Sequence, residues 1–129
     1  MNAGKIIYSK LTADAAVQGY LGGKIYPQVA PQDAEPLFLV YSTTSSQDTE
    51  TKEQSNPLTT LKVQVDIYGE QMIDCYDAAT EVRRVLNGIN EEVAGECVWS
   101  TCFKGIQDGY SGVDEVYRVM LFFDFIINN

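Results

Sequence analysis

The chain has 129 residues, 45% of them hydrophobic and 21% charged, which is the size and composition of one globular domain and excludes a wholly disordered chain. It carries 18 acidic and 9 basic residues, so its net charge is −9. A small chain this acidic is poorly suited to gripping nucleic acid, because phosphate contacts require Lys and Arg.

The sequence contains no histidine and three cysteines, Cys75, Cys97 and Cys102. Without histidine the chain cannot form a Ser-His-Asp or Cys-His catalytic site, or a zinc site that uses imidazole. No pair of cysteines has C-x-x-C spacing, and we find no signal peptide and no apolar run long enough to span a bilayer. We therefore expect reduced thiols, no metal, no cofactor and no membrane segment.

The first third of the chain is predicted to contain a helical region and a strand. Apolar side chains recur on one helical face over residues 3–21, where we expect Thr12 to cap a second short turn, and a Gly-Gly pair follows. Residues 24–27 end in a proline and are predicted to be extended. Residues 28–36 form a connecting loop, and the short apolar run 37–41 is predicted to be a buried strand.

Residues 42–57 are polar throughout, and nothing in this run can join a hydrophobic core. Apolar and polar residues then alternate over residues 61–68, the pattern of a half-exposed antiparallel strand. The polar run is therefore predicted to be a long hairpin loop between two strands. Loops of this length inside a compact domain are usually functional or mobile.

The second half is predicted to contain one helix and two strands. Residues 71–88 show the clearest helical stripe, formed by Cys75, Ala79, Val82, Leu86 and Ile89. Strands are expected over residues 97–103 and 117–125, with turn residues at 107–112 between them. This order of elements predicts an α+β fold, in which two main helices pack on one face of an antiparallel four-stranded sheet with a long polar hairpin loop.

Charged pairs that could serve acid–base chemistry are better explained as surface groups. The pairs are Glu91 with Glu92, Asp114 with Glu115, and Asp74 with Asp77, and all lie in predicted turns or on a solvated helix face. Arg83 and Arg84 lie beside Glu81 on the predicted helix, where local charge pairing is the simplest interpretation. Trp99 is predicted to be a core residue. No nucleophile, base and orienting group occur together, so no enzymatic activity is expected.

The last strand is unusual because it is apolar on nearly both faces. Val116, Met120, Phe122 and Ile126 oppose the odd-numbered apolar set. Such a strand is either central and covered on both sides, or its second face meets another subunit.

In the order and spacing of its segments the chain resembles the phage tail terminator family, whose members are also described as tail completion or head-to-tail joining proteins. The resemblance covers nearly the whole chain. Matching segments include Val-Gln-Val-Asp-Ile-Tyr at residues 63–68 and Tyr-Asp-Ala-Ala at 76–79. The most telling parts are Gly-Gly-Lys-Ile-Tyr-Pro at residues 22–27 and the paired terminal strands, the last of which runs from Tyr117 to Phe125. None of these motifs is catalytic.

The resemblance implies that residues 1–129 form a single tail-terminator-like domain that assembles into a hexameric ring. Such a ring caps the tail tube, stops its polymerisation and offers a surface to the head-completion or connector protein. The protein would lie in the tail or neck of the virion, after assembly in the host cytoplasm, and would need no enzyme activity and no cofactor. DNA would pass through the lumen, where like charge prevents adhesion.

In this interpretation the polar loop contacts a neighbouring subunit or the tail tube protein, or lines the lumen. The candidate residues are Gln47, Asp48, Glu50, Lys52, Glu53 and Gln54. Solvated disorder is the competing explanation of the loop. The alternative function is that of a small acidic inhibitory or regulatory module that binds a basic protein partner.

Overall fold

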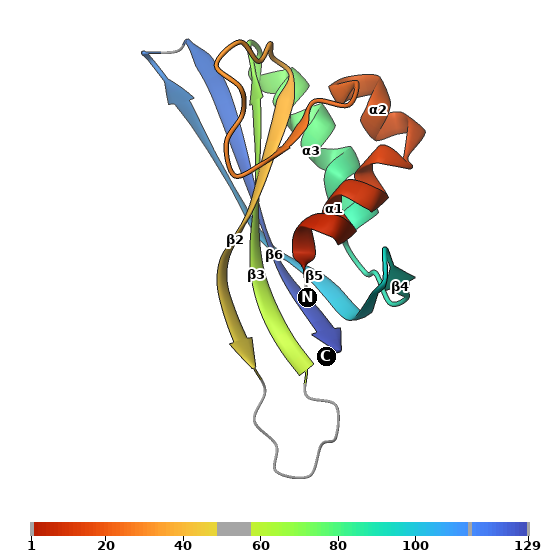
Figure 1. The fold of residues 1–129 in the computed structure, drawn as a ribbon. Coiled ribbons are helices and arrows are strands. Elements are labelled where there is room, and N and C mark those ends of the chain that lie inside the picture. The colour runs from red at the N-terminus through yellow and green to blue at the C-terminus, as the bar shows by residue number, and fades with distance from the viewer. Residues whose placement is uncertain (1, 49–57, 114, 129) are drawn as a thin grey trace.

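The computed structural model describes residues 2–48, 58–113 and 115–128, and Figure 1 shows its α+β fold. In chain order the elements are α1 (Ala3–Thr12), α2 (Ala15–Leu21), β1 (Ile25–Pro27), β2 (Phe38–Asp48), β3 (Leu58–Gly69), α3 (Met72–Leu86), β4 (Glu92–Val93), β5 (Glu96–Ser111) and β6 (Val116–Asn128).

The strands form one sheet in the order β1-β2-β3-β6-β5-β4. β1 runs parallel to β2, and all other neighbours are antiparallel. The prediction of four antiparallel strands is therefore wrong, because a short strand is added at each edge. β4 has only two residues, too few to show a strand period, and β1 is only three residues long. All three helices lie on one side of the sheet (Figure 1).

β2 and β5 extend well beyond the apolar runs from which they were predicted. β2 continues through the polar residues to Asp48, and its last four residues pair with residues 59–62 of β3 after an irregularity at Thr44. β5 continues to Ser111, so the turn predicted over residues 107–112 is wrong for most of its length. Both extensions are held by backbone pairing to the neighbouring strand, β3 or β6, which polar side chains permit when they remain in water.

The helical region at the N-terminus is two helices. Ala13 and Asp14 separate α1 from α2, and the Asp14 carboxylate accepts hydrogen bonds from the N–H groups of Ala16 and Val17 at 3.0 and 3.1 Å. Asp14 is therefore the N-cap of the second helix, and the prediction that Thr12 has this role is wrong. The Thr12 hydroxyl instead donates to the Tyr8 carbonyl within α1.

The core lies between the helices and one face of the sheet. The predicted stripe of α3 and the loop after it is confirmed, because each of its members is at most 5% exposed: Cys75, Ala79, Val82, Leu86 and Ile89. It packs with alternate apolar residues of β3 and β6 in one cluster. Thr101 of β5 closes the C-terminal end of α3: its buried hydroxyl donates to the Leu86 carbonyl at 2.5 Å and accepts from the Ile89 N–H at 2.8 Å.

Candidate functional site

The predicted loop residues fall into two groups. Gln47 and Asp48 belong to the end of β2, where they pair with Thr60 and Thr59 of β3. For these two residues the loop prediction is wrong. The other four candidates, Glu50, Lys52, Glu53 and Gln54, lie outside the described residues.

The side of the sheet that faces away from the helices is a second candidate, which we call the open face. We define it by the following residues of β2, β3 and β6: Phe38, Val40, Lys62, Gln64, Asp66, Tyr68, Arg118, Met120, Phe122, Asp124 and Ile126. They alternate along each strand with the core residues, so they project to the opposite side. Phe122 and Ile126 are half-buried on this face although β6 is a central strand of the sheet.

One end of the open face is aromatic. The rings of Phe38 and Tyr68, which are register partners on β2 and β3, stack with centroids 5.0 Å apart and an interplanar angle of 20°. Tyr26 of β1 adds a third ring, 6.2 Å from that of Phe38. Stacked aromatic pairs present a large and rigid contact area, and aromatic residues are enriched at protein interfaces.

The middle of the open face carries a half-buried carboxylate, that of Asp66. Its register neighbours are the apolar Val40 and Met120, and burial raises its pKa. A hydrogen bond from the Gln64 amide, 2.9 Å long, and the charge of Arg118 oppose that rise. We expect a carboxylate kept partly out of water among apolar neighbours to cost the monomer some stability.

The other end of the open face holds a small group of charges. The Asp124 carboxylate of β6 lies 3.2 Å from the Lys62 ammonium of β3 and 3.9 Å from the Lys104 ammonium of β5. These contacts cross three adjacent strands. The open face therefore combines apolar and charged side chains of both signs, the composition of a surface that a partner can cover.

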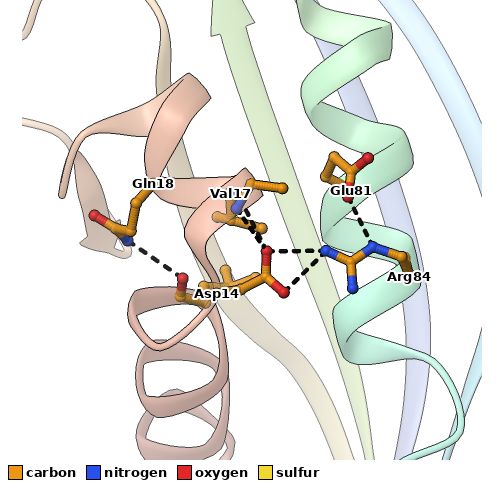
Figure 2. Close-up of polar contacts among 7 residues, drawn as sticks. Asp14, Val17, Gln18, Glu81 and Arg84 are labelled. Atoms are coloured by element: carbon orange, nitrogen blue, oxygen red, sulfur yellow. Dashed lines mark hydrogen bonds and ion pairs between the residues drawn. The ribbon is translucent and has the colours of Figure 1, made fainter.

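The helical layer is fastened by a separate charge network, drawn in Figure 2. The Arg84 guanidinium of α3 donates to both carboxylate oxygens of Asp14 at 2.9 Å and to Glu81 at 2.7 Å. These bonds to Arg84, together with the Val17 N–H, hold the pKa of Asp14 below its usual value. The prediction that Arg84 pairs locally with Glu81 is confirmed. The network joins α2 to α3, and a further ion pair joins Lys10 of α1 to Glu91.

The charged pairs considered for acid–base chemistry lie at the surface wherever they are described. Asp74, Asp77, Glu91 and Glu92 are exposed, and so is Glu115, whereas Asp114 is outside the described residues. In the described part of the chain, no group of three or more Cys, Asp or Glu residues is placed to hold a metal ion.

The described cysteines do not line the cavity beside α1. Burial raises the pKa of Cys75 to about 11, so its thiol stays protonated, and Cys97 and Cys102 are exposed. A cavity of about 590 Å³ beside α1 is lined by Lys5, Tyr8 and hydroxyl residues, and the described side chains around it include no carboxylate and no thiol. None of the described helices is long and apolar enough to cross a membrane.

Trp99 is exposed, so the prediction that it is a core residue is wrong. It lies in β5 at an irregularity between Val98 and Ser100, and its side chain is 57% exposed. An extra residue at such a bulge shifts the alternation of the strand, so the side chain turns away from the core. Phe103, further along the same strand, packs against the core and lies under the guanidinium of Arg83, 4.0 Å from the ring centre.

Comparison with known proteins identifies a family and structural neighbours. The family model described as "Tail completion protein gp17" matches residues 5–128. Among solved structures, a chain of the "Virion of native gene transfer agent (GTA) particle" is similar, with a TM-score of 0.79 and 16% sequence identity. The match covers 98% of this chain and 97% of that one, so the whole fold is shared. No curated protein matches the chain in a sequence search.

Proposed function

The chain belongs to the tail completion protein gp17 family, and on that premise we propose that it is a ring-forming subunit that caps the tail tube of a long-tailed phage or prophage. A structural role in the phage tail follows from the family. The finer proposal is that the ring, with about six copies as the resemblance implies, stops tube polymerisation. It would then present a surface to the head-completion or connector protein. In this role residues 1–129 act as one domain.

The open face is the observation that carries this proposal. β6 is a central strand with apolar side chains on both faces, and the helices cover only one of them (Figure 1). In a subunit that remained monomeric in water, a polar second face would be better solvated than an apolar one. Partly exposed Phe122 and Ile126, next to a half-buried carboxylate, support a surface that other virion subunits cover.

The charge of the chain is consistent with a channel through which DNA passes. A net charge of −9 repels the phosphate backbone, and a wall that repels DNA lets it move without adhering. We propose that Gln47, Asp48, Glu50, Lys52, Glu53 and Gln54 contact the tail tube protein or line this lumen. Two of them, Gln47 and Asp48, extend β2 along the backbone of β3.

The ring is tested by native mass spectrometry of the purified chain and by electron microscopy of assembled particles. We expect a closed ring of about six copies, the stoichiometry that the family resemblance implies, in solution or at the end of the tail. A chain that stays monomeric in both settings and instead binds a basic protein would refute the proposal and favour the acidic inhibitory module.

The loop is tested by substitution, because deleting residues 46–54 would also remove three residues of β2. Replacing Glu50, Glu53 and Lys52 by Gln should leave folding and ring formation intact and lower the yield of joined, infectious particles. The same number of exposed charges replaced on the helices, Asp74→Asn, Asp77→Asn and Lys5→Gln, is the control. Normal particle yield from the loop variant would remove the proposed role of the loop but not that of the ring.

A further inference from the structure

Both edges of the sheet are only partly covered by other strands. β1 pairs with Leu39–Tyr41 at the start of β2, and β4 pairs with Glu96 and Cys97 at the start of β5. The next part of β5 is bonded by the loop after α3: the Phe103 N–H donates to Asn87, and the Thr101 carbonyl accepts from Gly88. In the described part of the chain no strand borders the remainder of either edge.

We call these remainders the β2 edge, Ser45–Asp48, and the β5 edge, Gly105–Tyr110. Each is held in regular register by its inner neighbour, because the irregularities at Thr44 and Lys104 come before it. An extended strand that is paired on one side presents a row of backbone N–H and C=O groups on the other side. Such a row is a template for another strand.

Neither edge carries proline or lysine, the residues most typical of protected edges, in residues 45–48 and 105–110. Each edge has one charged residue, Asp48 or Asp108, and the Asp108 carboxylate accepts a hydrogen bond from the Tyr76 hydroxyl of α3. The β5 edge also exposes large apolar side chains: Ile106 is 47% exposed and Tyr110 is 57% exposed. Val113, in the turn that follows, is 95% exposed. Exposed apolar groups beside backbone groups that can receive a strand indicate an interface.

We propose that the β5 edge of one copy pairs with the β2 edge of the next, so that the sheet continues from subunit to subunit. This inference rests on the ring of the proposed function and names the surfaces that build it. The two edges lie at the two lateral ends of one sheet. Because β2, β3, β6 and β5 are each antiparallel to the next strand, β2 and β5 run in opposite directions. Continuing the sheet therefore creates an antiparallel pair, the slightly more stable kind of ladder.

The arrangement also permits a ring. An interface between two different surfaces leaves each copy with one free surface of each kind, so addition can repeat, and it ends in a ring when the rotation between copies closes. Pairing of a β5 edge with a second β5 edge would stop at a dimer. The proposed occupant of each edge is a second copy of this chain, because every copy carries both edges and can pair with one neighbour at each.

Cysteine cross-linking tests the pairing and its register. In a background with Cys97→Ser and Cys102→Ser, Ser45→Cys is mixed with one of three variants whose positions face the open side of the sheet: Gly105→Cys, Gln107→Cys and Gly109→Cys. Register partners on adjacent strands project to the same side, so one of these mixtures should lose its monomer band to a covalent dimer on mild oxidation. The double variant with both cysteines should give a ladder of covalent oligomers.

Two controls use the period of the strand. Ile106→Cys and Tyr110→Cys are at exposed positions whose side chains project to the other side, so they should not cross-link to Ser45→Cys. Ala16→Cys, exposed on α2, reports random collision.

A further variant, Ile106→Lys with Tyr110→Lys, should stay folded by circular dichroism and lose the ring.

The outcomes separate this inference from the proposed function. A ring seen by native mass spectrometry or in particles, without cross-links at any open-side position or with equal cross-links at Ile106, would overturn the edge pairing and leave the ring standing. No ring in solution or in assembled particles would overturn both.

Discussion

Phe122 and Phe123 are neighbours on β6, yet they occupy opposite faces of the sheet with very different surroundings. Phe123 is 1% exposed, and its ring meets Phe103 and Phe125 edge-on at 5.6 and 6.1 Å. Phe122 is half-buried on the open face, between register partners Gln64 and Gly105. One face of the strand thus packs in the core of the subunit, whereas the other leaves apolar surface partly in water, which we propose serves assembly.

The largest expected effect separates these two faces directly. Phe123→Ala should lower the free energy of unfolding by about 3–5 kcal/mol, because it removes a fully buried ring and leaves a cavity. Phe122→Ala should cost the monomer much less, since its side chain is already partly in water, and should instead lower the yield of joined particles, because we propose that other virion subunits cover this face. Urea unfolding gives the first quantity, and the yield of infectious particles gives the second.

Equal losses of unfolding free energy in the two variants would contradict the comparison, because the open face would then be as important to the monomer as the core. Phe122→Leu is a control that keeps an apolar side chain. It should retain most of the particle yield that Phe122→Ala loses.

A smaller effect is expected from adding one methyl group on each side of the sheet. A Cβ at Gly69 would lie 2.7 Å from the Cys75 sulfur and 2.8 Å from a Leu37 methyl carbon, beneath α3. Gly69→Ala should therefore cost about 1–3 kcal/mol through overpacking. A Cβ at Gly109, across from Arg118 on the open side, would meet nothing within 4 Å.

Gly109→Ala should leave stability unchanged or raise it by about 0.5–1 kcal/mol, because alanine loses less backbone entropy than glycine in a strand. Thermal unfolding of both variants measures the difference. A destabilising Gly109→Ala would show that the open side is closely packed in the isolated subunit, contrary to the comparison.

The elements predicted from periodicity were those whose side chains pack on the core. The stripe of α3 and the alternation in β3 specify a buried face directly, and both predictions agree with the structure. The ends of β2 and β5 could not be predicted in the same way. Residues such as Thr43 and Gln107 join the sheet through their backbones and leave their side chains in water, so hydropathy does not mark them as strand.

The open face was only half predictable. The sequence shows that β6 is apolar on both sides. Whether its second face is covered by the subunit's own helices or by another subunit depends on where the helices pack, which is a property of the whole fold. Asp66 was not identified, because an alternating strand normally places a charge in water. Its burial arises from neighbours on other strands, Val40 and Met120, which are distant in the sequence.

The smallest predicted effects are changes with pH, and they should have opposite signs on the two sides of the sheet. Bonds to Arg84 and to the Val17 N–H lower the folded pKa of Asp14 below 3.8, so its contribution to stability is present above pH 3.8 and is lost as the pH falls through the folded pKa. Burial raises the folded pKa of Asp66 above 3.8, so its carboxylate destabilises the folded subunit increasingly as the pH rises from 3.8 through that pKa.

Asp14→Asn should therefore be less stable than the parent chain near neutral pH and match it in strong acid. Asp66→Asn should be more stable near neutral pH and lose that advantage below pH 3.8. Urea unfolding across this range measures both, with Asp77→Asn on the exposed side of α3 as the control for removing one charge. An Asp66→Asn variant that is less stable near neutral pH would mean that attraction to Arg118 outweighs the cost of burial. The open face would then be stable in the isolated subunit without a partner to cover it.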